Sequence, residues 1–299
     1  MTIPPSLIDA LAAVLDAPPH DVRPVHGGDI SRAARFTADS RPYLVKWHDR
    51  PPTPPPGWPD LFTAEAQGLA RLTEAGAIRV PAPRAFAAAQ DDCPAYIVLE
   101  WIETGHGDRR EAGVKLGHGL AALHRVTAQA YGLDHGNYCG ATPQANGWMD
   151  SWIAFYAERR LGWQMDLAGR AGLMHRERRR QLERLIDRLE RWIDEAAVRP
   201  SLLHGDLWGG NWLVAADGEP ALIDPAIYFG DREAELAMCH LFDGFPADFF
   251  RAYDEAWPPA AGRDDRRPLY QLYHLLNHLN LFGEGYGGQV DAILRRYVG

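Results

Sequence analysis

The sequence predicts an α+β protein with a small β-rich N-terminal lobe and a larger, mainly helical C-terminal lobe. Two observations lead to this prediction. Short strand-like segments dominate as far as about residue 102, and long stretches with helical spacing of apolar residues follow. The chain has 299 residues, of which 46% are hydrophobic, so it can fill a sizeable core. We therefore expect lobes at residues 1–102 and 103–299.

The N-terminal lobe is expected to start with a packed helix within residues 1–19, where Leu7, Leu11 and Leu15 follow helical spacing. The expected later elements are strands at 35–38, 43–48 and 96–101 and one helix at 62–74. Between the second strand and that helix lies the proline-rich stretch 51–59. Proline lacks the N–H donor that a helix interior or a central strand needs, so this stretch is predicted to be a surface loop.

The C-terminal lobe is expected to carry long helices interrupted by short strands. The helices are predicted at 114–126, 149–167, 176–196 and 268–282, and the strands at 201–203, 211–214 and 220–223. The dipeptide Asp217-Gly218 between the last two strands is typical of a tight hairpin turn. A β-hairpin is therefore predicted inside a helical lobe.

Charge and cysteine content exclude several classes of protein. The net charge of −9 argues against a nucleic-acid-binding surface, which needs clustered Lys and Arg. The three cysteines, Cys93, Cys139 and Cys239, are widely spaced and suit neither a disulfide framework nor a CxxC metal site. The first residues lack the basic start of a secretory signal, and no segment is long and apolar enough to span a membrane. We expect a cytoplasmic protein.

The strongest chemical signal is the run His-Gly-Asp-Leu-Trp-Gly-Gly-Asn at 204–211, followed by Asp224 at the end of the predicted hairpin. Phosphoryl transfer needs a carboxylate that receives the proton of the attacking hydroxyl and ligands that hold a metal against phosphates. Asp206 is the candidate catalytic base, and Asn211 and Asp224 are the candidate ligands of Mg²⁺, which prefers one or two carboxylates with phosphate and water. The alternative for His-Gly-Asp alone is a turn in which Asp caps a backbone N–H.

This segment resembles the signature of the fructosamine kinases, which belong with aminoglycoside and choline phosphotransferases in the protein-kinase-like superfamily. Trp208, directly after His-Gly-Asp-Leu, favours this family over the aminoglycoside-modifying relatives. The resemblance covers nearly the whole chain, with further similar segments at 116–124, 139–148, 152–160, 224–237 and 269–283. It implies a protein-kinase-like fold and transfer of the γ-phosphoryl group of ATP to the C3 hydroxyl of a ketosamine. The 3-phosphate then breaks down and frees the amine, which is deglycation.

Lys46 lies in an apolar strand, where a lone lysine either reaches out to solvent or finds an anion. By resemblance it corresponds to the kinase lysine that holds the α- and β-phosphates, and Glu65 in the following helix corresponds to its ion-pair partner. Glu74 in the same helix is a rival partner. For Glu65 the alternative role is an exposed helix face.

Two further nucleotide contacts are expected, the first from the resemblance and the second from position. The loop between the first strands should cover the phosphates, and the end of the small lobe should be a hinge that meets adenine through backbone groups. The loop residues are Gly27, Gly28, Ile30 and Ser31, and the hinge residues are Glu100, Trp101 and Ile102. A simple turn and a simple edge strand would look the same in sequence.

For the acceptor we expect Trp208 beside the base and His278 in the last long helix, although core packing is the usual fate of a Trp and of a lone helical His. For Asp231, Glu233 and Glu235 the alternatives are ordering of the pocket or binding of a substrate amine. We expect a structural role, since carboxylates stabilise a helix N-terminus. The expected partners are ATP, Mg²⁺ and a ketosamine or glycated lysine, with no nucleic acid, no membrane and a monomeric chain. Rival functions are a kinase for choline, homoserine or an aminoglycoside, and a nucleotide-binding pseudokinase.

Overall fold

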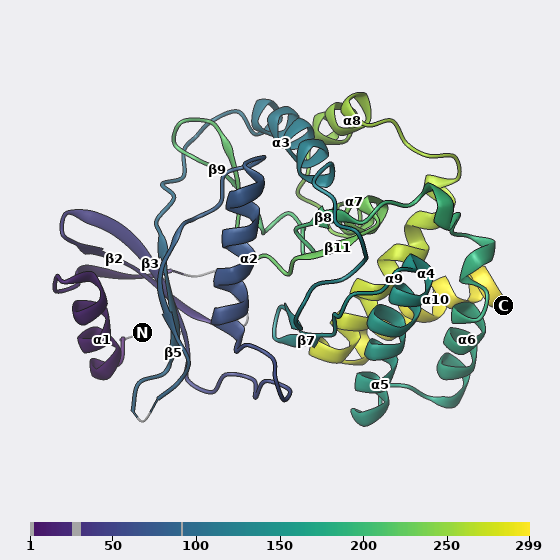
Figure 1. Ribbon diagram of the computed structural model, residues 1–299, viewed down its shortest axis with the longest axis horizontal. Coiled ribbons are helices and arrows are strands. Elements are labelled where there is room, and N and C mark those ends of the chain that lie inside the picture. The colour runs from purple at the N-terminus through teal and green to yellow at the C-terminus, as the bar shows by residue number, and fades with distance from the viewer. Residues whose placement is uncertain (1–2, 26–30, 91) are drawn as a thin grey trace.

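The computed structural model describes residues 3–25, 31–90 and 92–299, in which an N-terminal antiparallel sheet adjoins a largely helical part (Figure 1). The sheet has the strand order β1-β2-β3-β5-β4. Its part of the chain contains α1 (Pro5–Leu15), β1 (His20–Val25), β2 (Arg32–Ala38), β3 (Arg41–His48), α2 (Leu61–Ala75), β4 (Pro83–Ala87) and β5 (Ala95–Glu100). The predicted α+β class with a β-rich beginning is confirmed.

Strand β3 shows how the sequence gives the two faces of the sheet different side chains. Side chains alternate between the two faces of a strand, so Val45 and Trp47 point one way and Lys46 points the other. Val45 and Trp47 are fully buried in a core that includes Leu7 and Leu11 of α1. The opposite face, which carries Lys46, is covered by α2. Helices on both faces explain why nearly every residue of β5 is buried.

Helix α2 is held at both ends by local signals. The carboxylate of Asp60 accepts the backbone N–H groups of Phe62 and Thr63, and Gly76 ends the helix in the left-handed region with φ of 62°. The preceding proline-rich stretch 51–59 has no helix or strand, as predicted. The helix therefore begins and ends at fixed points, which also fixes the depth of Glu65 against the sheet.

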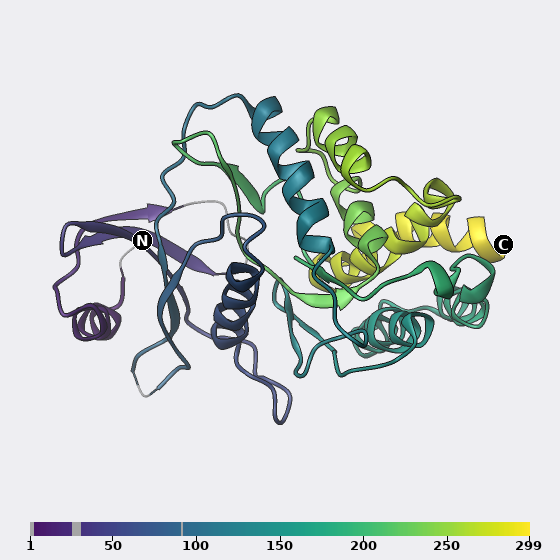
Figure 2. The same cartoon turned by 45° about the horizontal axis from the view of Figure 1, so that its top comes forward.

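The remaining chain is mainly helical, and its described residues form three short antiparallel strand pairs between the helices. Its elements are α3 (Arg109–His124), β6 (Asn137–Cys139), β7 (Thr142–Gln144), α4 (Trp152–Phe155), η1 (Tyr156–Gly162), α5 (Trp163–Arg170), α6 (Arg176–Ile186), η2 (Leu189–Arg191), η3 (Glu195–Ala197), β8 (Ser201–Leu203), β9 (Trp212–Val214), β10 (Pro220–Leu222), β11 (Tyr228–Gly230), α7 (Arg232–Cys239), α8 (Ala247–Ala256), α9 (Arg263–Phe282), η4 (Glu284–Tyr286) and α10 (Gly287–Val298). The predicted hairpin is present, because β9 and β10 pair antiparallel. Figure 2 shows α3 and α8 packed side by side above the rest.

Three predicted helix boundaries are wrong by five residues or more. The helix predicted at 114–126 begins at Arg109, where the Asp108 side chain accepts the N–H of Arg110. The helix predicted at 176–196 ends at Ile186, and short 3-10 turns then bring Leu189 and Ile193 into the core at the spacing the pattern required. Helix α9 begins at Arg263 rather than at Pro268, because its first residues are charged and have no apolar spacing. Asp264 and Asp265 in the first turn favour the helix start instead.

None of the helices within the described ranges is long and apolar enough to cross a membrane.

Candidate active site

A cavity of about 960 Å³ lies between the sheet and the helical part, and most of the predicted site residues line it. Those that line it are Ser31, Lys46, Glu65, Glu100, Trp101, Ile102, Asp206, Trp208, Asn211, Asp224 and His278. The predicted loop residues Gly27, Gly28 and Ile30 lie outside the described residues. The fold therefore brings residues from distant parts of the sequence to one cavity.

Lys46 joins the two halves of the site through a pair of carboxylates. Its Nζ lies 2.7 Å from Glu65 Oε1 and also forms an ion pair with Asp224. Burial alone would lower the pKa of Lys46, but the charges of Asp224 and Glu65 outweigh it and raise that pKa above its ordinary value. Glu74, the rival partner, instead pairs with Arg71 on an exposed face. The side chain of Lys46 is therefore positively charged, and its position is fixed by the two carboxylates.

The loop that carries Asp206 depends on a glycine and a histidine. Gly205 has φ of 85°, and a Cβ at this position would collide with the carbonyl oxygen of Ala226. The Asp206 N–H points at His204 Nδ1 at 3.4 Å, so Nδ1 is the acceptor and Nε2–H donates to Ile223 O at 2.9 Å. His204 is fully buried and burial lowers its pKa, which keeps the ring neutral. The His-Gly-Asp motif thus fixes the backbone beneath Asp206.

Glu235 supports the same loop from α7. Its carboxylate accepts the N–H of His204 at 2.9 Å and the N–H of Gly205 at 2.6 Å, and it also bonds to His124 Nε2 at 3.0 Å. Burial alone would raise the pKa of Glu235, but the His124 hydrogen bond and the backbone donors outweigh it and hold that pKa below its ordinary value. For Glu235 we preferred a helix-start role to ordering of the pocket, and the structure shows it hydrogen-bonded to the candidate catalytic loop.

Asn211 and Asp224 lie beside Asp206 and present oxygen atoms to the cavity. The Asn211 amide donates to Asp206 O at 2.8 Å, which leaves its Oδ1 available as an acceptor or ligand. Asp224 has φ of 58°, a left-handed conformation that Asp tolerates better than most residues. Its side chain is 43% exposed. A hard cation would meet two side-chain oxygens here.

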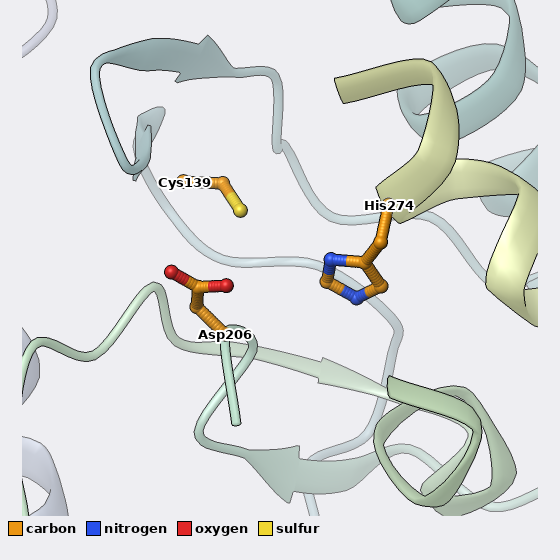
Figure 3. A group of neighbouring side chains, drawn as sticks. All are labelled: Cys139, Asp206 and His274. Atoms are coloured by element: carbon orange, nitrogen blue, oxygen red, sulfur yellow. The ribbon is translucent and has the colours of Figure 1, made fainter. Parts of the chain in front are cut away.

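The pKa of Asp206 is raised, as is typical of a carboxylate that acts as a general base. Burial, followed by the negative charge of Asp224, raises the pKa of Asp206 to about 7. At neutral pH the carboxylate therefore gains a proton far more readily than an ordinary Asp. Figure 3 shows Asp206 facing two further side chains, Cys139 and His274, that come from β6 and α9. These two neighbours were not predicted as site residues.

The predicted hinge residues differ in whether their backbone N–H groups are already used in hydrogen bonds. The N–H of Glu100 already donates to Ala82 O at 2.9 Å, and that of Trp101 points to Pro42 O at 3.4 Å. The Glu100 side chain is also engaged, in a 2.8 Å ion pair with Arg79. Ile102 is buried and lines the cavity with Trp101.

The two residues predicted for the acceptor also line the cavity. The side chain of Trp208 is 39% exposed, so Trp208 is not packed in the core, which was the alternative to a contact with the acceptor. His278 packs among aromatic rings, with centroids 4.8 Å from Phe242 and 5.0 Å from Tyr286. Its Nδ1 lies 2.8 Å from His274 O, and burial lowers its pKa. Apolar and aromatic side chains therefore line the same cavity as the candidate base.

Comparison with known proteins identifies the family of this chain. The family model described as fructosamine kinase matches residues 6–299. The chain belongs to the fructosamine kinase family. A probable ketoamine kinase of Lactiplantibacillus plantarum is 40% identical over 276 residues, which cover 92% of this chain and 94% of the relative.

Solved structures show the same fold for this fructosamine kinase family member. A crystal structure assigned by name as a fructosamine-3-kinase of Thermobifida fusca has a TM-score of 0.83 and 31% identity, and the match covers 97% of each chain. A ternary complex of an aminoglycoside phosphotransferase with ADP and hygromycin B has a TM-score of 0.65 at 18% identity, covering 98% of this chain and 99% of that one. The predicted protein-kinase-like fold is confirmed.

The segment at 139–148, which resembles the family, is joined by buried hydrogen bonds to the chain that follows Asp224. The sequence did not predict this role. Asn137 and Gln144 donate to the carbonyl oxygens of Ile227 and Ala226, at 2.8 and 3.0 Å. The Tyr273 hydroxyl donates to Gln144 Oε1 at 2.6 Å. This buried network fastens the β6–β7 hairpin beside the Asp206 loop.

Proposed function

We propose that this member of the family transfers the γ-phosphoryl group of ATP to the C3 hydroxyl of ketosamines, the sugar adducts of an amine or a lysine. The family membership and the names of the relatives support this reaction. The single observation that carries it is the grouping of Asp206, Asn211, Asp224 and the Lys46–Glu65 pair on one cavity. Breakdown of the 3-phosphate would free the amine, so the reaction serves deglycation.

Asp206 is proposed as the catalytic base. The acceptor oxygen attacks the γ-phosphorus, the bond to the bridging oxygen breaks with ADP as the leaving group, and the hydroxyl proton goes to Asp206. The raised pKa of Asp206, about 7, suits a group that accepts a proton near neutral pH. Glu235 and His204 hold its loop, so the carboxylate keeps its orientation during transfer.

For the nucleotide, we assign Lys46 to the α- and β-phosphates and Glu65 to orienting it. ATP would displace Asp224 from Lys46, since both are anions that compete for one ammonium group. The loop residues Gly27, Gly28, Ile30 and Ser31 are assigned to covering the phosphates. At the hinge, the used N–H groups of Glu100 and Trp101 leave the Ile102 N–H as the adenine donor.

Asn211 and Asp224 are assigned as the ligands of Mg²⁺. The donor set fits, because it consists of one amide oxygen and one carboxylate, which are the hard oxygen ligands that Mg²⁺ prefers. When bound, Mg²⁺ would neutralise charge on the β- and γ-phosphates. The role of the chain is to hold the amide in place through its hydrogen bond to Asp206 O.

Trp208 and His278 are proposed to contact the acceptor. An exposed Trp beside the base can stack on sugar C–H groups, and the aromatic wall around His278 can receive the amine side of the adduct. We further propose a nucleotide-binding lobe at 1–102, a catalytic lobe at 103–299 and a monomeric cytoplasmic protein. Choline, homoserine and aminoglycoside acceptors are the rivals, and the family membership favours ketosamines over them and over a pseudokinase role.

The proposal is tested by replacing the base alone. Asp206→Asn should retain ATP binding, measured by calorimetry with Mg²⁺, and should lose about 10²–10⁴-fold in kcat with fructose-lysine, the range for general base catalysis. Gln129→Glu, at an exposed position outside the cavity, serves as a variant with an added charge and unchanged turnover. Full activity of Asp206→Asn would overturn the assignment.

A further inference from the structure

Cys139, Asp206 and His274 form a cluster that the proposed phosphoryl transfer does not use as a unit. One ligand-type atom of each lies within 4.8 Å of those of the other two. In Figure 3 the thiol, the carboxylate and the edge of the imidazole ring converge from three separate elements: the end of β6, the loop after β8, and α9. Cys139 and His274 are 1% and 3% exposed, and Asp206 lines the cavity.

His274 supplies an independent sign of a ligand. Its Nδ1 is buried and has no hydrogen-bond partner among the residues that the structure describes. A buried polar atom is normally satisfied, so an unpaired ring nitrogen beside a thiol and a carboxylate calls for an explanation. Burial lowers the pKa of His274 to about 3, so the ring is neutral and its nitrogen lone pair is free to bind a cation.

Burial, followed by the negative charge of Asp206, raises the pKa of the Cys139 thiol, so a bound cation must itself displace the thiol proton. The Asn277 amide donates to Cys139 Sγ at 3.4 Å, and hydrogen bonds of this kind orient and stabilise metal-bound sulfur. Tetrahedral Zn²⁺ with bond lengths of roughly 2.0–2.3 Å places its ligand atoms about 3.3–3.8 Å apart. Side-chain adjustments of about 1 Å would bring the present cluster to that geometry.

We propose that Cys139, Asp206 and His274 form an inhibitory site for Zn²⁺ or a similar borderline-soft divalent cation, reached through the ATP cavity. Binding replaces the thiol proton of Cys139, which leaves to solvent, and forms one bond each to sulfur, oxygen and nitrogen. Three protein ligands with a fourth position open to water are typical of accessible zinc sites. Mg²⁺ does not compete, because thiolate and imidazole are poor ligands for it.

The inhibitory effect rests on the proposed function of Asp206, whereas cation binding does not. A carboxylate bonded to Zn²⁺ cannot accept the acceptor's proton, so turnover would stop even with Mg²⁺ and ATP in place. This mode differs from simple replacement of Mg²⁺ in the nucleotide complex, which would leave Cys139 unbound. The thiol therefore distinguishes the two explanations.

Binding is tested first with Co²⁺, a spectroscopic substitute for Zn²⁺. The full chain should show a thiolate-to-cobalt charge-transfer band that Zn²⁺ removes by displacement. The band should be absent in Cys139→Ser and weakened in His274→Gln. It should persist in two matched controls, Cys93→Ser, a partly exposed thiol outside the cavity, and His278→Gln, one turn along the same helix. Circular dichroism confirms that each variant is folded.

Inhibition is then measured at a fixed excess of Mg²⁺ and ATP, relative to the uninhibited rate of each variant. Zn²⁺ should inhibit the wild type and Cys93→Ser alike. Half-inhibition of Cys139→Ser should need a Zn²⁺ concentration more than about 100-fold higher than that of the wild type. This exceeds the loss of metal affinity of about 10–100-fold expected when only a partner of a ligand is removed. A cobalt spectrum without the thiolate band, or equal inhibition of Cys139→Ser, would overturn the proposal. A normal cobalt band in a chain without kinase activity would overturn the proposed function and retain the site.

Discussion

Replacement of Glu235 by Gln separates positioning of the catalytic loop from stability of the fold. The carboxylate accepts three buried hydrogen bonds, from the His204 N–H, the Gly205 N–H and His124. A Gln side chain has one oxygen and one NH₂ group, so at least one of these donors faces another donor. A buried unsatisfied donor costs about 1–3 kcal/mol, and the bonds that remain lose the extra strength of a charged acceptor. We expect the free energy of unfolding to fall by about 2–4 kcal/mol.

Glu233→Gln is the matched control, because Glu233 lies on the same helix α7 and is 6% exposed. Its carboxylate accepts two hydrogen bonds from Arg266, both 2.8 Å long, and none from the candidate catalytic loop as far as the structure describes the chain. The same substitution should therefore lower stability by a similar amount and leave kcat nearly unchanged. Glu235→Gln should lower kcat by at least about tenfold, since small displacements of a catalytic group are costly.

The assay combines urea unfolding with steady-state kinetics at a temperature where both variants stay folded. The structure predicts loss of stability in both variants and loss of kcat in Glu235→Gln alone. Equal kcat in the two variants would refute the positioning role of Glu235, whichever variant is less stable.

Four further outcomes follow from the geometry of the site. Asp206→Asn should unfold at a higher urea concentration than the wild type at pH 8. The pKa of Asp206 in the folded chain, about 7, lies above its value in the unfolded chain, so ionisation of Asp206 destabilises the fold as pH rises through 7. The variant should gain about 1–3 kcal/mol in free energy of unfolding at pH 8, and this gain should vanish near pH 4. Glu65→Gln should raise the KM for ATP, whereas Glu74→Gln, on an exposed face, should not. Gly205→Ala should lose both activity and at least about 1–3 kcal/mol of stability in thermal unfolding, because of its positive φ and the Ala226 carbonyl. Trp208→Ala should raise the KM for the ketosamine by about three- to tenfold without changing the KM for ATP, as measured by varying each substrate in turn.

Much of the candidate site could be predicted because its members are local in sequence. Asp206, Asn211 and Asp224 lie in one loop and the hairpin after it, so their spacing alone implies that they meet. Lys46 could be predicted because it is a lone lysine in an apolar strand, and in the structure it lies on the face opposite Val45 and Trp47. The choice between Glu65 and Glu74 needed the structure, because both lie on one helix and only its depth against the sheet decides which faces Lys46.

Residues that depend on tertiary contacts could not be predicted. Cys139 and His274 reach Asp206 from separate elements, and no spacing rule relates positions so far apart. The same holds for Glu235, whose position near a helix start suggested a dipole effect, while its actual partners are backbone groups of another segment. Short strands such as β6 and β7 carry too few residues for a periodic signal.

The reaction itself is tested most directly by the position of the transferred phosphate. The chain should be incubated with ATP, Mg²⁺ and an equimolar panel of ribulose-lysine, fructose-lysine, choline and an aminoglycoside, and the products should be assigned by phosphorus and carbon NMR. Our account predicts phosphate on the C3 oxygen of a ketosamine and none on choline or the aminoglycoside. Phosphate on another acceptor alone, or at another ketosamine hydroxyl, would contradict it.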